Sequence, residues 1–347
     1  MKRCIHFGGD NACYHPSQFG KGLQNGEMSC LGCPKRVFEY AMPQPDWPVF
    51  QELPPQALQP NRQTLLRLVD FGTGQVSNCS LIRYNGKLLL AYRCGWRKSN
   101  IALATLDESY QMASVRVPKL DTHPAHAHAR EDPRLFHCAG GLWMSYTGVN
   151  RAEQPGQVAR TMFSELSDDV CPVHAPYFGQ SRKWEKNWMF FEHDGELLSV
   201  YDSHPLRIAK MSKDFKHYTI FKTAHWNRPE ALGMLRGGCP PVRVGDEYYV
   251  FGHGSFMHGP GEGGRWDPWY VATLFTFCAK TFVPLRVCRN PLMIPRPGDC
   301  PKGWQPKVVY PGGAVFDNGV WKISYGYHDH ACWIAEFTDG QIEQVLE

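Results

Sequence analysis

The sequence lacks three features: a long apolar run, a strong charge of either sign and an apolar N-terminal stretch. Without 18 consecutive apolar residues, it offers no transmembrane helix. Its 37 Lys and Arg against 33 Asp and Glu give a net charge of +4, which is too balanced for an electrostatic nucleic-acid binder. Because residues 1–6 do not resemble a signal peptide, we expect a cytoplasmic protein with reduced thiols. We therefore expect no nucleic-acid partner and no membrane partner.

Turn-forming and aromatic residues are abundant instead. The 347 residues include 33 Gly and 27 Pro, and 13% of the chain is aromatic. Many turn formers together with many aromatic residues predict numerous short strands rather than long helices. With 43% hydrophobic residues, the chain is also large and apolar enough to bury a substantial core.

The cysteines are unevenly distributed. There are 13, an odd number, and four of them precede residue 34: Cys4, Cys13, Cys30 and Cys33. The Cys-x-x-Cys spacing of the last two allows two thiolates to hold one tetrahedral ion, which predicts a structural zinc or iron–sulfur site. The alternative is that these are ordinary reduced thiols, because the spacing between Cys4 and Cys13 fits no standard metal-binding pair.

A repeated turn signal organises the rest of the chain. Two-residue pairs that favour tight hairpin turns recur, and their marker glycines are 50 to 55 residues apart, with a final interval of 74. An apolar strand follows each pair. The pairs are Asn85-Gly86, Gly140-Gly141, Asp194-Gly195, Gly245-Asp246 and Asn318-Gly319.

Five such units predict an all-β fold, a five-bladed β-propeller. The competing architecture is a β-sandwich with irregular loops. Residues 62–347 form the propeller in this interpretation. Residues 1–61 form a short irregular cysteine-containing N-terminal extension that ends in a proline-rich strap, and this extension could also contribute to a homo-oligomer.

The first strand of each blade lines the central channel of a propeller, and polar residues at those positions indicate a site. The clearest group is Arg130-Glu131-Asp132-Pro133-Arg134, in which Pro133 interrupts the strand ladder. One carboxyl group of this cluster could point into the channel and act as a general acid. The alternative is a solvated group of ion pairs, the usual fate of clustered charges.

Later blades contribute further candidates. Lys186 offers a point charge for an anion, and His253 ends its strand between two glycines. The paired glycines Gly237-Gly238 could present backbone N–H groups to an oxyanion, although a tight turn would explain them equally well.

Taken in order, these motifs resemble glycoside hydrolase family 130, the β-mannoside phosphorylases and β-1,2-mannosidases, and related inverting mannosyltransferases. The resemblance covers about residues 62–347 and implies a five-bladed propeller. The matching motifs are Glu131-Asp132-Pro133-Arg134, Met144-Ser145-Tyr146-Thr147, Lys186-Asn187 with Phe190-Phe191-Glu192, Gly237-Gly238-Cys239-Pro240-Pro241, His253-Gly254, Pro311-Gly312-Gly313-Ala314-Val315 and Tyr325-Gly326 with Asp329.

The resemblance implies roles for individual residues. Asp132 matches the proton donor to the glycosidic oxygen, and Asn78 and Asp329 match contacts to sugar hydroxyls. The remaining candidate substrate contacts are Arg134, Asn187, Gly238 and Tyr146.

In the phosphorylases of this family, phosphate is held by an Arg-Asn pair, a lysine and a histidine. Lys186 and His253 match this set, whereas the pair here reads Asn150-Arg151, in reversed order. A single acid with cationic donors suits inverting phosphorolysis, because inverting hydrolysis needs a second carboxylate to activate water. Glu185, Glu192 and Glu262 are the candidates for that second group.

We therefore expect a carbohydrate-active enzyme that cleaves or forms a β-mannoside-like bond with inversion, by phosphorolysis, with a glycoside or oligosaccharide and inorganic phosphate as its partners. It needs no cofactor for catalysis. The alternatives are an inverting hydrolase or a glycosyltransferase of the same fold, and a non-catalytic propeller that binds glycans.

Overall fold

A computed structural model describes residues 47–95, 98–150, 159–176, 184–259, 267–299 and 307–347. These residues are mostly strand, so the expected all-β fold is confirmed. The helices among them are short, and none is long and apolar enough to cross a membrane. They are η2 (Pro124–His126), η3 (Glu230–Leu232), η5 (Pro297–Asp299) and α1 (Asp339–Val345).

The described strands form four hydrogen-bonded sheets. The first contains β3 (Val76–Tyr84), β4 (Lys87–Cys94), β5 (Asn100–Leu106) and β6 (Met112–Arg116), and the second contains β7 (Ala129–Cys138), β8 (Gly141–Val149) and β9 (Ala159–Glu165). The third contains β10 (Met189–His193), β11 (Glu196–Ser203), β12 (Leu206–Met211) and β13 (Tyr218–Ala224). Each of these three sheets is an antiparallel meander of strands in sequence order.

The fourth sheet has ten strands. Its main path is β1 (Val49–Phe50), β16 (Glu247–His258), β17 (Asp267–Cys278), β19 (Lys307–Asp317), β20 (Val320–Tyr327), β21 (Ala331–Thr338) and β2 (Arg62–Leu65). Strands β14 (Met234–Arg236) and β15 (Val242–Val244) pair with β16, and β18 (Pro284–Val287) pairs with β17. The sequence predicts five blades, whereas hydrogen bonding gives four sheets because a two-residue parallel pairing joins β17 to β19.

All five predicted turns join adjacent antiparallel strands. In four of the five turns as observed, both central residues have positive φ, as the tight type I′ hairpin requires. The second turn differs by one residue from the prediction. Its turn residues are Ala139 (φ 49°) and Gly140 (φ 75°), while Gly141 already begins β8.

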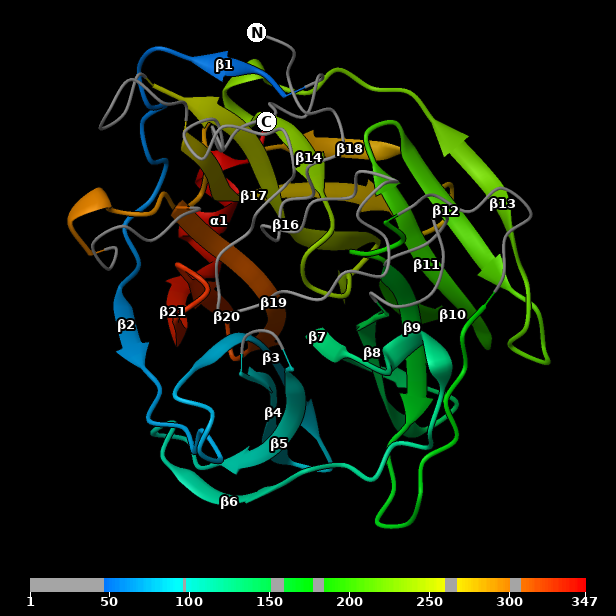
Figure 1. Cartoon of the computed structure of the whole chain (residues 1–347). Coiled ribbons are helices and arrows are strands. Elements are labelled where there is room, and N and C mark those ends of the chain that lie inside the picture. Colours follow the sequence, from blue (N-terminus) through cyan, green and yellow to red (C-terminus); the bar gives the residue numbers. More distant parts are fainter. Residues whose placement is uncertain (1–46, 96–97, 151–158, 177–183, 260–266, 300–306) are drawn as a thin grey trace, which may run out of the picture.

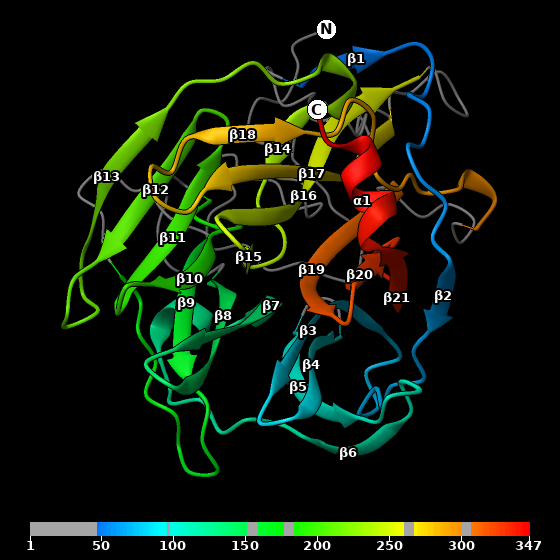
Figure 2. The same ribbon diagram turned by 180° about the vertical axis from the view of Figure 1, so that it is seen from behind.

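The sheets lie side by side around a common centre, where β3, β7 and β19 are nearest the middle (Figures 1 and 2). Each sheet packs on the next through buried apolar side chains. Leu81 and Leu90 of the first sheet share a cluster with Val315 and Ile334 of the fourth. The first sheet therefore packs against strands near the C-terminus.

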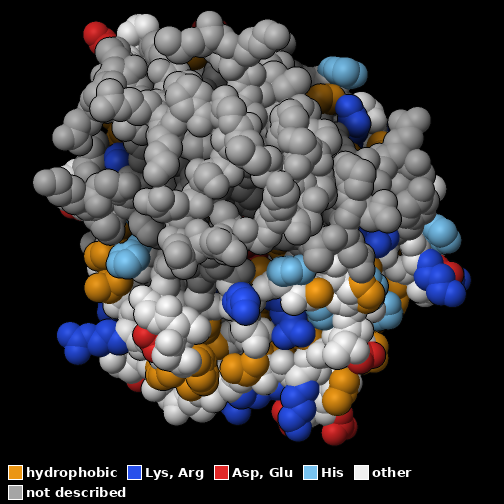
Figure 3. Space-filling model, in the orientation of Figure 1, with side chains coloured by type: hydrophobic (Ala, Val, Ile, Leu, Met, Phe, Trp, Pro, Cys, Tyr) orange, Lys and Arg blue, Asp and Glu red, His pale blue; other side chains and the backbone are white. Residues whose placement is uncertain are grey.

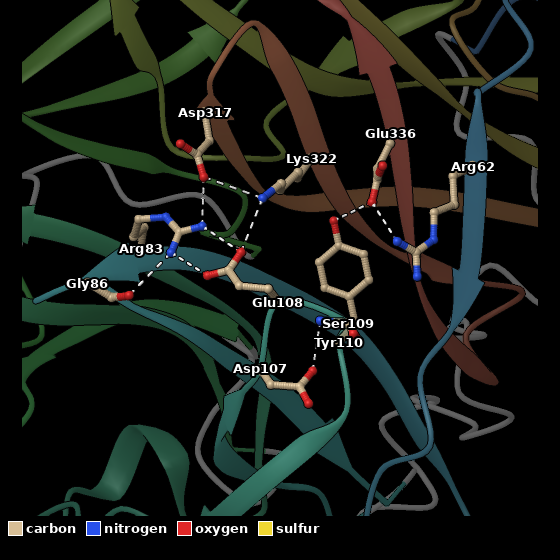
Figure 4. Close-up of polar contacts among 10 residues, drawn as sticks. All are labelled: Arg62, Arg83, Gly86, Asp107, Glu108, Ser109, Tyr110, Asp317, Lys322 and Glu336. Carbon is tan, nitrogen blue, oxygen red and sulfur yellow. Dashed lines mark hydrogen bonds and ion pairs between the residues drawn. The ribbon is translucent and has the colours of Figure 1, made fainter.

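Polar contacts reinforce this junction between the first and fourth sheets (Figure 4). Arg83 of β3 pairs with Glu108 at 2.8 Å and with Asp317 of β19 at 2.7 Å. The hydroxyl group of Tyr110 donates to Glu336 of β21 at 2.6 Å. These contacts hold the first sheet against the fourth.

Candidate active site

Four polar residues near the centre share an unusual backbone conformation. Asn78, Asp132, Asn187 and Asp329 have φ angles of 50°, 53°, 69° and 51°. Asn and Asp are the residues that best tolerate this left-handed region after glycine. Strain of this kind is concentrated at functional sites, so its recurrence here marks a candidate site.

Bulges explain how two of these side chains leave the strand ladder. The register between β3 and β4 shifts between Ser77 and Ser80, and that between β7 and β8 shifts between Glu131 and Arg134. A β-bulge bends a strand and re-aims a side chain. Asn78 and Asp132 lie within these shifts, and the Nδ2 of Asn78 donates to the Oδ1 of Asp132 at 2.7 Å.

A buried arginine accompanies this pair. Arg93 places Nη2 3.1 Å from the Oε1 of Glu131 and Nη1 3.8 Å from the Oδ1 of Asp132. Its Nε donates to the carbonyl oxygen of Gly95 at 3.2 Å. Arg93 is only 5% exposed, so its charge acts on both carboxylates at low local dielectric.

The surroundings drive two neighbouring carboxyl groups in opposite directions. Burial alone would raise the pKa of Asp132, but the charges of Arg93, Lys186 and Arg134, with the hydrogen bond from Asn78, hold it below its ordinary value. Burial and the negative charge of Asp132 raise the pKa of Asp329, although part of that residue reaches solvent. Such divergence is typical of acid–base pairs in active sites.

Arg134 ties the central strands together. It is 2% exposed and donates through Nε to the carbonyl oxygen of Gly238 at 2.7 Å and through Nη2 to the Oδ1 of Asn187 at 3.0 Å. Its Nη1 donates to the backbone oxygen of Asp132 at 3.0 Å, and Nη2 also reaches the hydroxyl group of Tyr310. Burial lowers the pKa of Arg134 to about 10, so it remains charged at neutral pH.

Two central glycines are required by close backbone packing. A Cβ at Gly238 would lie 2.4 Å from the carbonyl oxygen of Phe251, and one at Gly312 would lie 2.3 Å from that of Cys79. The N–H of Gly238 is directed to the Sδ of Met189 at 3.1 Å. Both polar backbone groups of Gly238 are thus engaged within the protein, and its predicted contact to substrate stays a prediction.

Basic groups lie beside this centre. Lys186 places Nζ 5.8 Å from the ring centroid of Trp184, and its charge acts on both Asp132 and His253. The Nδ1 of His253 lies 2.8 Å from the carbonyl oxygen of Gly237; a carbonyl can only accept, so Nδ1 carries the proton. In the face shown in Figure 3, Lys, Arg and His side chains gather near the middle, beside the grey region.

The pKa of His253 is well below its ordinary value. Burial is the main cause, and the charges of Arg236, Arg134 and Lys186 add to it. His253 is therefore neutral at physiological pH, with an unprotonated Nε2. An anion that brings its own proton, or that raises this pKa by its charge, would suit such a group.

The structure locates the other predicted site residues as follows. Asn150 is buried, and its Nδ2 donates to the carbonyl oxygen of Pro124 at 2.9 Å. Tyr146 lies in the apolar cluster between the first two sheets, with its hydroxyl group 2.8 Å from the Nδ1 of His126. The predicted residues outside the described part of the chain are Arg151, Glu262, Cys4, Cys13, Cys30 and Cys33.

No group of three or more His, Cys, Asp or Glu within the described ranges could hold a metal ion. The predicted zinc or iron–sulfur site falls on residues before 47 and stays a prediction.

Sequence reasoning missed Arg93, Arg236, Tyr270 and Tyr310. Arg93 lies near the end of β4 (Lys87–Cys94), where a single arginine is ordinary in a sequence, and only the structure shows that it is buried. Arg236 directly precedes Gly237-Gly238, and Tyr310 directly precedes Pro311-Gly312. Nothing in their spacing shows where these residues meet. Strand pairing places Arg236 beside His253, and neighbouring sheets bring Arg93 to Asp132 and Tyr310 to Arg134.

No protein-family model and no curated protein sequence matches this chain. Solved structures do match its fold. A mannose phosphorylase from Leishmania mexicana, in complex with phosphate ion, is 16% identical with a TM-score of 0.60, covering 82% of this chain and 90% of that one. The β-1,2-mannobiose phosphorylase from Listeria innocua is 13% identical with a TM-score of 0.59, covering 83% of this chain and 95% of that one.

A third structure comes from work on glycoside hydrolase family 130, described as mannoside phosphorylases that include hydrolases of β-1,2 mannosidic linkages in Candida mannan. It is 18% identical with a TM-score of 0.57, covering 77% of this chain and 85% of that one. The neighbours are thus members of glycoside hydrolase family 130, which agrees with the resemblance that the motifs predict. At these identities the likeness concerns the fold alone.

Proposed function

We propose that the protein is an inverting carbohydrate-active enzyme that cleaves or forms a β-mannoside-like bond with phosphate as the nucleophile. One observation carries the proposal: the buried carboxyl group of Asp132 lies within the field of Lys186, which also acts on buried His253. An acid for the leaving group and a basic site for an anion therefore adjoin each other. These are the two functions that phosphorolysis requires.

In this proposal Asp132 protonates the glycosidic oxygen, while Lys186 and His253 bind the attacking phosphate, together with Asn150 and Arg151. Asn78, Asn187 and Asp329 orient the sugar. Attack from the face opposite the leaving group inverts the anomeric carbon, so a β-mannoside would yield an α-configured sugar 1-phosphate.

Phosphate binding would also prepare the acid. In the free protein the surrounding cations keep Asp132 ionised. A phosphate dianion beside Lys186 would offset part of this positive field and raise the pKa of Asp132. Protonation of the acid is thus coupled to the presence of the nucleophile.

Glu185 and Glu192, the described candidates for a carboxylate that activates water, do not suit that role. The carboxyl group of Glu185 accepts from the Nε1 of Trp188 at 3.3 Å and from the hydroxyl group of Tyr201 at 3.2 Å, within an aromatic cluster. Glu192 accepts from the backbone N–H of Ala139, at the turn between β7 and β8. Glu262, the third candidate, lies outside the described residues. The engagements of Glu185 and Glu192 favour phosphate over water as the nucleophile.

Product analysis with variants tests the proposal. β-1,2- and β-1,4-mannosides are incubated with inorganic phosphate, and sugar 1-phosphate is quantified for wild type, Asp132→Asn and Lys186→Ala. We expect Asp132→Asn to lower kcat by about 10²–10⁴-fold, the usual contribution of a general acid. We expect Lys186→Ala to raise KM for phosphate more than KM for the glycoside. Full turnover of Asp132→Asn would remove this residue from the acid role.

We also propose that the ten-stranded sheet represents two blades of a five-bladed propeller. Among the described residues, the named strands of its two halves pair only through Trp269–Lys307 and Tyr270–Val308, and one isolated bridge joins Cys288 to Leu346. Separate apolar clusters between successive groups of strands support the same division.

A further inference from the structure

The chain just before the first sheet is fastened to the fourth sheet. Strand β1 (Val49–Phe50) pairs in parallel with Met257–His258 of β16, and the N–H of Met257 donates to the carbonyl oxygen of Pro48 at 2.9 Å. The ring of Phe50 packs on that of Phe256, with centroids 4.6 Å apart. Residues 47–50 are part of the predicted proline-rich strap, and from here on the name strap refers to these four residues.

The first residue of the strap is buried next to two residues of the central region. Trp47 is 8% exposed and meets the ring of Tyr270 edge-on, at 5.5 Å and 89°. The guanidinium carbon of Arg236 lies 5.2 Å from the centroid of the Trp47 ring, within the range of a cation–π interaction. Trp47 thus packs against the guanidinium group of Arg236.

Arg236 in turn is a direct neighbour of His253. The two residues are register partners on adjacent strands β14 and β16, so their side chains lie on the same face, one beside the other. The ring of Tyr270 lies 5.6 Å from that of His253 and completes the group. The charge of Arg236 reaches His253 strongly enough to disfavour its protonation. Arg134 and Lys186 act on the same imidazole, so the charges of three cations reach it.

We propose that Arg236 is a further anion-binding residue of this site and that Trp47 is its positioning residue. The proposal rests on the proposed function, since it assigns ligands to the same anion site. The ligand class is a phosphate oxyanion, as inorganic phosphate or as the phosphate group of a sugar 1-phosphate. A guanidinium group presents N–H donors in a planar fork that fits two phosphate oxygens, which the single ammonium group of Lys186 does not.

Binding measurements on the full chain test both assignments. The dissociation constants of inorganic phosphate and of α-mannose 1-phosphate are measured by calorimetry at fixed ionic strength. The proteins are wild type, Arg236→Gln, Trp47→Ala and Trp47→Phe, with Phe50→Ala as the matched control. Phe50 belongs to the same strap but packs on Phe256 rather than on Arg236.

We expect Arg236→Gln to weaken both anions about tenfold or more, as a lost charge-assisted contact does. Trp47→Ala should weaken them about 3- to 10-fold, and Trp47→Phe should restore most of the affinity because a ring remains. Phe50→Ala should lower the melting temperature and leave anion affinity within twofold of wild type. In turnover, Arg236→Gln should raise KM for phosphate and leave KM for the glycoside unchanged.

Two results would overturn the inference in distinguishable ways. If wild type binds the anions and Arg236→Gln binds them equally well, the role of Arg236 is wrong while the proposed function stands. If wild type binds neither anion, both proposals fail. Equal losses of affinity in Trp47→Ala and Phe50→Ala would show that the strap acts only through stability, which contradicts the positioning role of Trp47.

Discussion

At the scale of single residues, the central feature is a pair of carboxyl groups with opposite environments. Asp132 is surrounded by cations, whereas Asp329 is affected mainly by burial and by the charge of Asp132. Asn78 interacts with both and so links them electrostatically. In the free protein these environments favour the ionised form of Asp132 and disfavour that of Asp329.

Replacing Asp329 by Asn should stabilise the protein at neutral pH while lowering activity. When the pKa of a carboxyl group is higher in the folded than in the unfolded protein, the free energy of unfolding falls as the pH rises from the unfolded pKa to the folded pKa. At neutral pH the ionised group therefore destabilises the folded protein by the full amount. Removing the charge should add about 0.5–2 kcal/mol to the free energy of unfolding, a usual gain when functional strain is relieved.

Asp317→Asn is the matched control, because Asp317 pairs with Arg83 and Lys322 and should lose up to about 1 kcal/mol. Chemical denaturation at pH 7 and pH 4 measures both variants. A loss of stability in Asp329→Asn at pH 7 would contradict the assignment.

Anion binding should be accompanied by proton uptake. The pKa of His253 is well below 6.5 in the free protein and that of Asp132 is below its usual range, and a bound dianion raises both. The affinity for a dianion should therefore increase as the pH falls from 8 to 6. Calorimetry in buffers of different ionisation enthalpy should detect uptake of up to about one proton for each anion bound.

Sulfate provides the control for this measurement, because it remains a dianion throughout that range. Any proton taken up with sulfate must go to the protein. Binding of sulfate without proton uptake, at an affinity independent of pH, would refute the coupling.

At the scale of elements, the innermost strands are shaped by bulges and by close backbone contacts. The bulge in β19 lies between Pro311 and Gly313, and Gly312 within it packs against the backbone of β3 (Val76–Tyr84) at Cys79. Because the neighbour is backbone and cannot rotate away, a side chain at this position would push the two strands apart. Strand β3 carries Asn78, so Gly312 affects where that side chain lies.

Gly312→Ala should therefore destabilise the protein by about 1–3 kcal/mol, the range for overpacked cores, and should lower activity as well. Gly340 in α1 offers a matched control, since a Cβ there meets nothing within 4 Å. Gly340→Ala should be neutral or stabilising by up to about 1 kcal/mol. Thermal unfolding measures both, and equal melting temperatures for the two variants would contradict the packing account.

The junction in Figure 4 makes a second prediction at this scale. Tyr110→Phe removes the hydrogen bond to Glu336 and keeps the buried ring, so it should lower the free energy of unfolding by about 1 kcal/mol. Activity should be unchanged because the junction lies outside the group around Asp132. Urea denaturation and the phosphorolysis assay together check this, and a large loss of activity would contradict it.

At the scale of the whole molecule, the sequence predicted local features well because turn chemistry is local. Asn85-Gly86 and Asn318-Gly319 adopt the positive φ angles that their residue types favour. The second turn lies at Ala139-Gly140, one residue before the predicted pair. Several small residues follow one another here, so strand pairing determines which two form the turn. The count of sheets depends on a two-residue contact between β17 and β19, which no local pattern encodes.

The candidate site was predictable only in part, for a related reason. Asn78 and Asp132 stand out because polar residues at innermost positions oppose the apolar strand pattern, and the two meet at 2.7 Å. Arg93 lies on β4, the second strand of its sheet, and Arg236 lies on the short strand β14. A single arginine on such a strand is ordinary, so neither residue stands out in the sequence. The role of Arg93 depends on which sheets become neighbours, and that of Arg236 depends on the pairing of β14 with β16.

The most direct test of the central claim follows phosphorus during turnover. A β-mannoside and inorganic phosphate are incubated with wild-type protein and observed by ³¹P NMR, with a parallel reaction that omits phosphate. The account predicts that the phosphate signal converts one-for-one into that of α-mannose 1-phosphate, and that no sugar is released without phosphate. Release of free mannose at the same rate in the absence of phosphate, with no sugar phosphate formed, would contradict it.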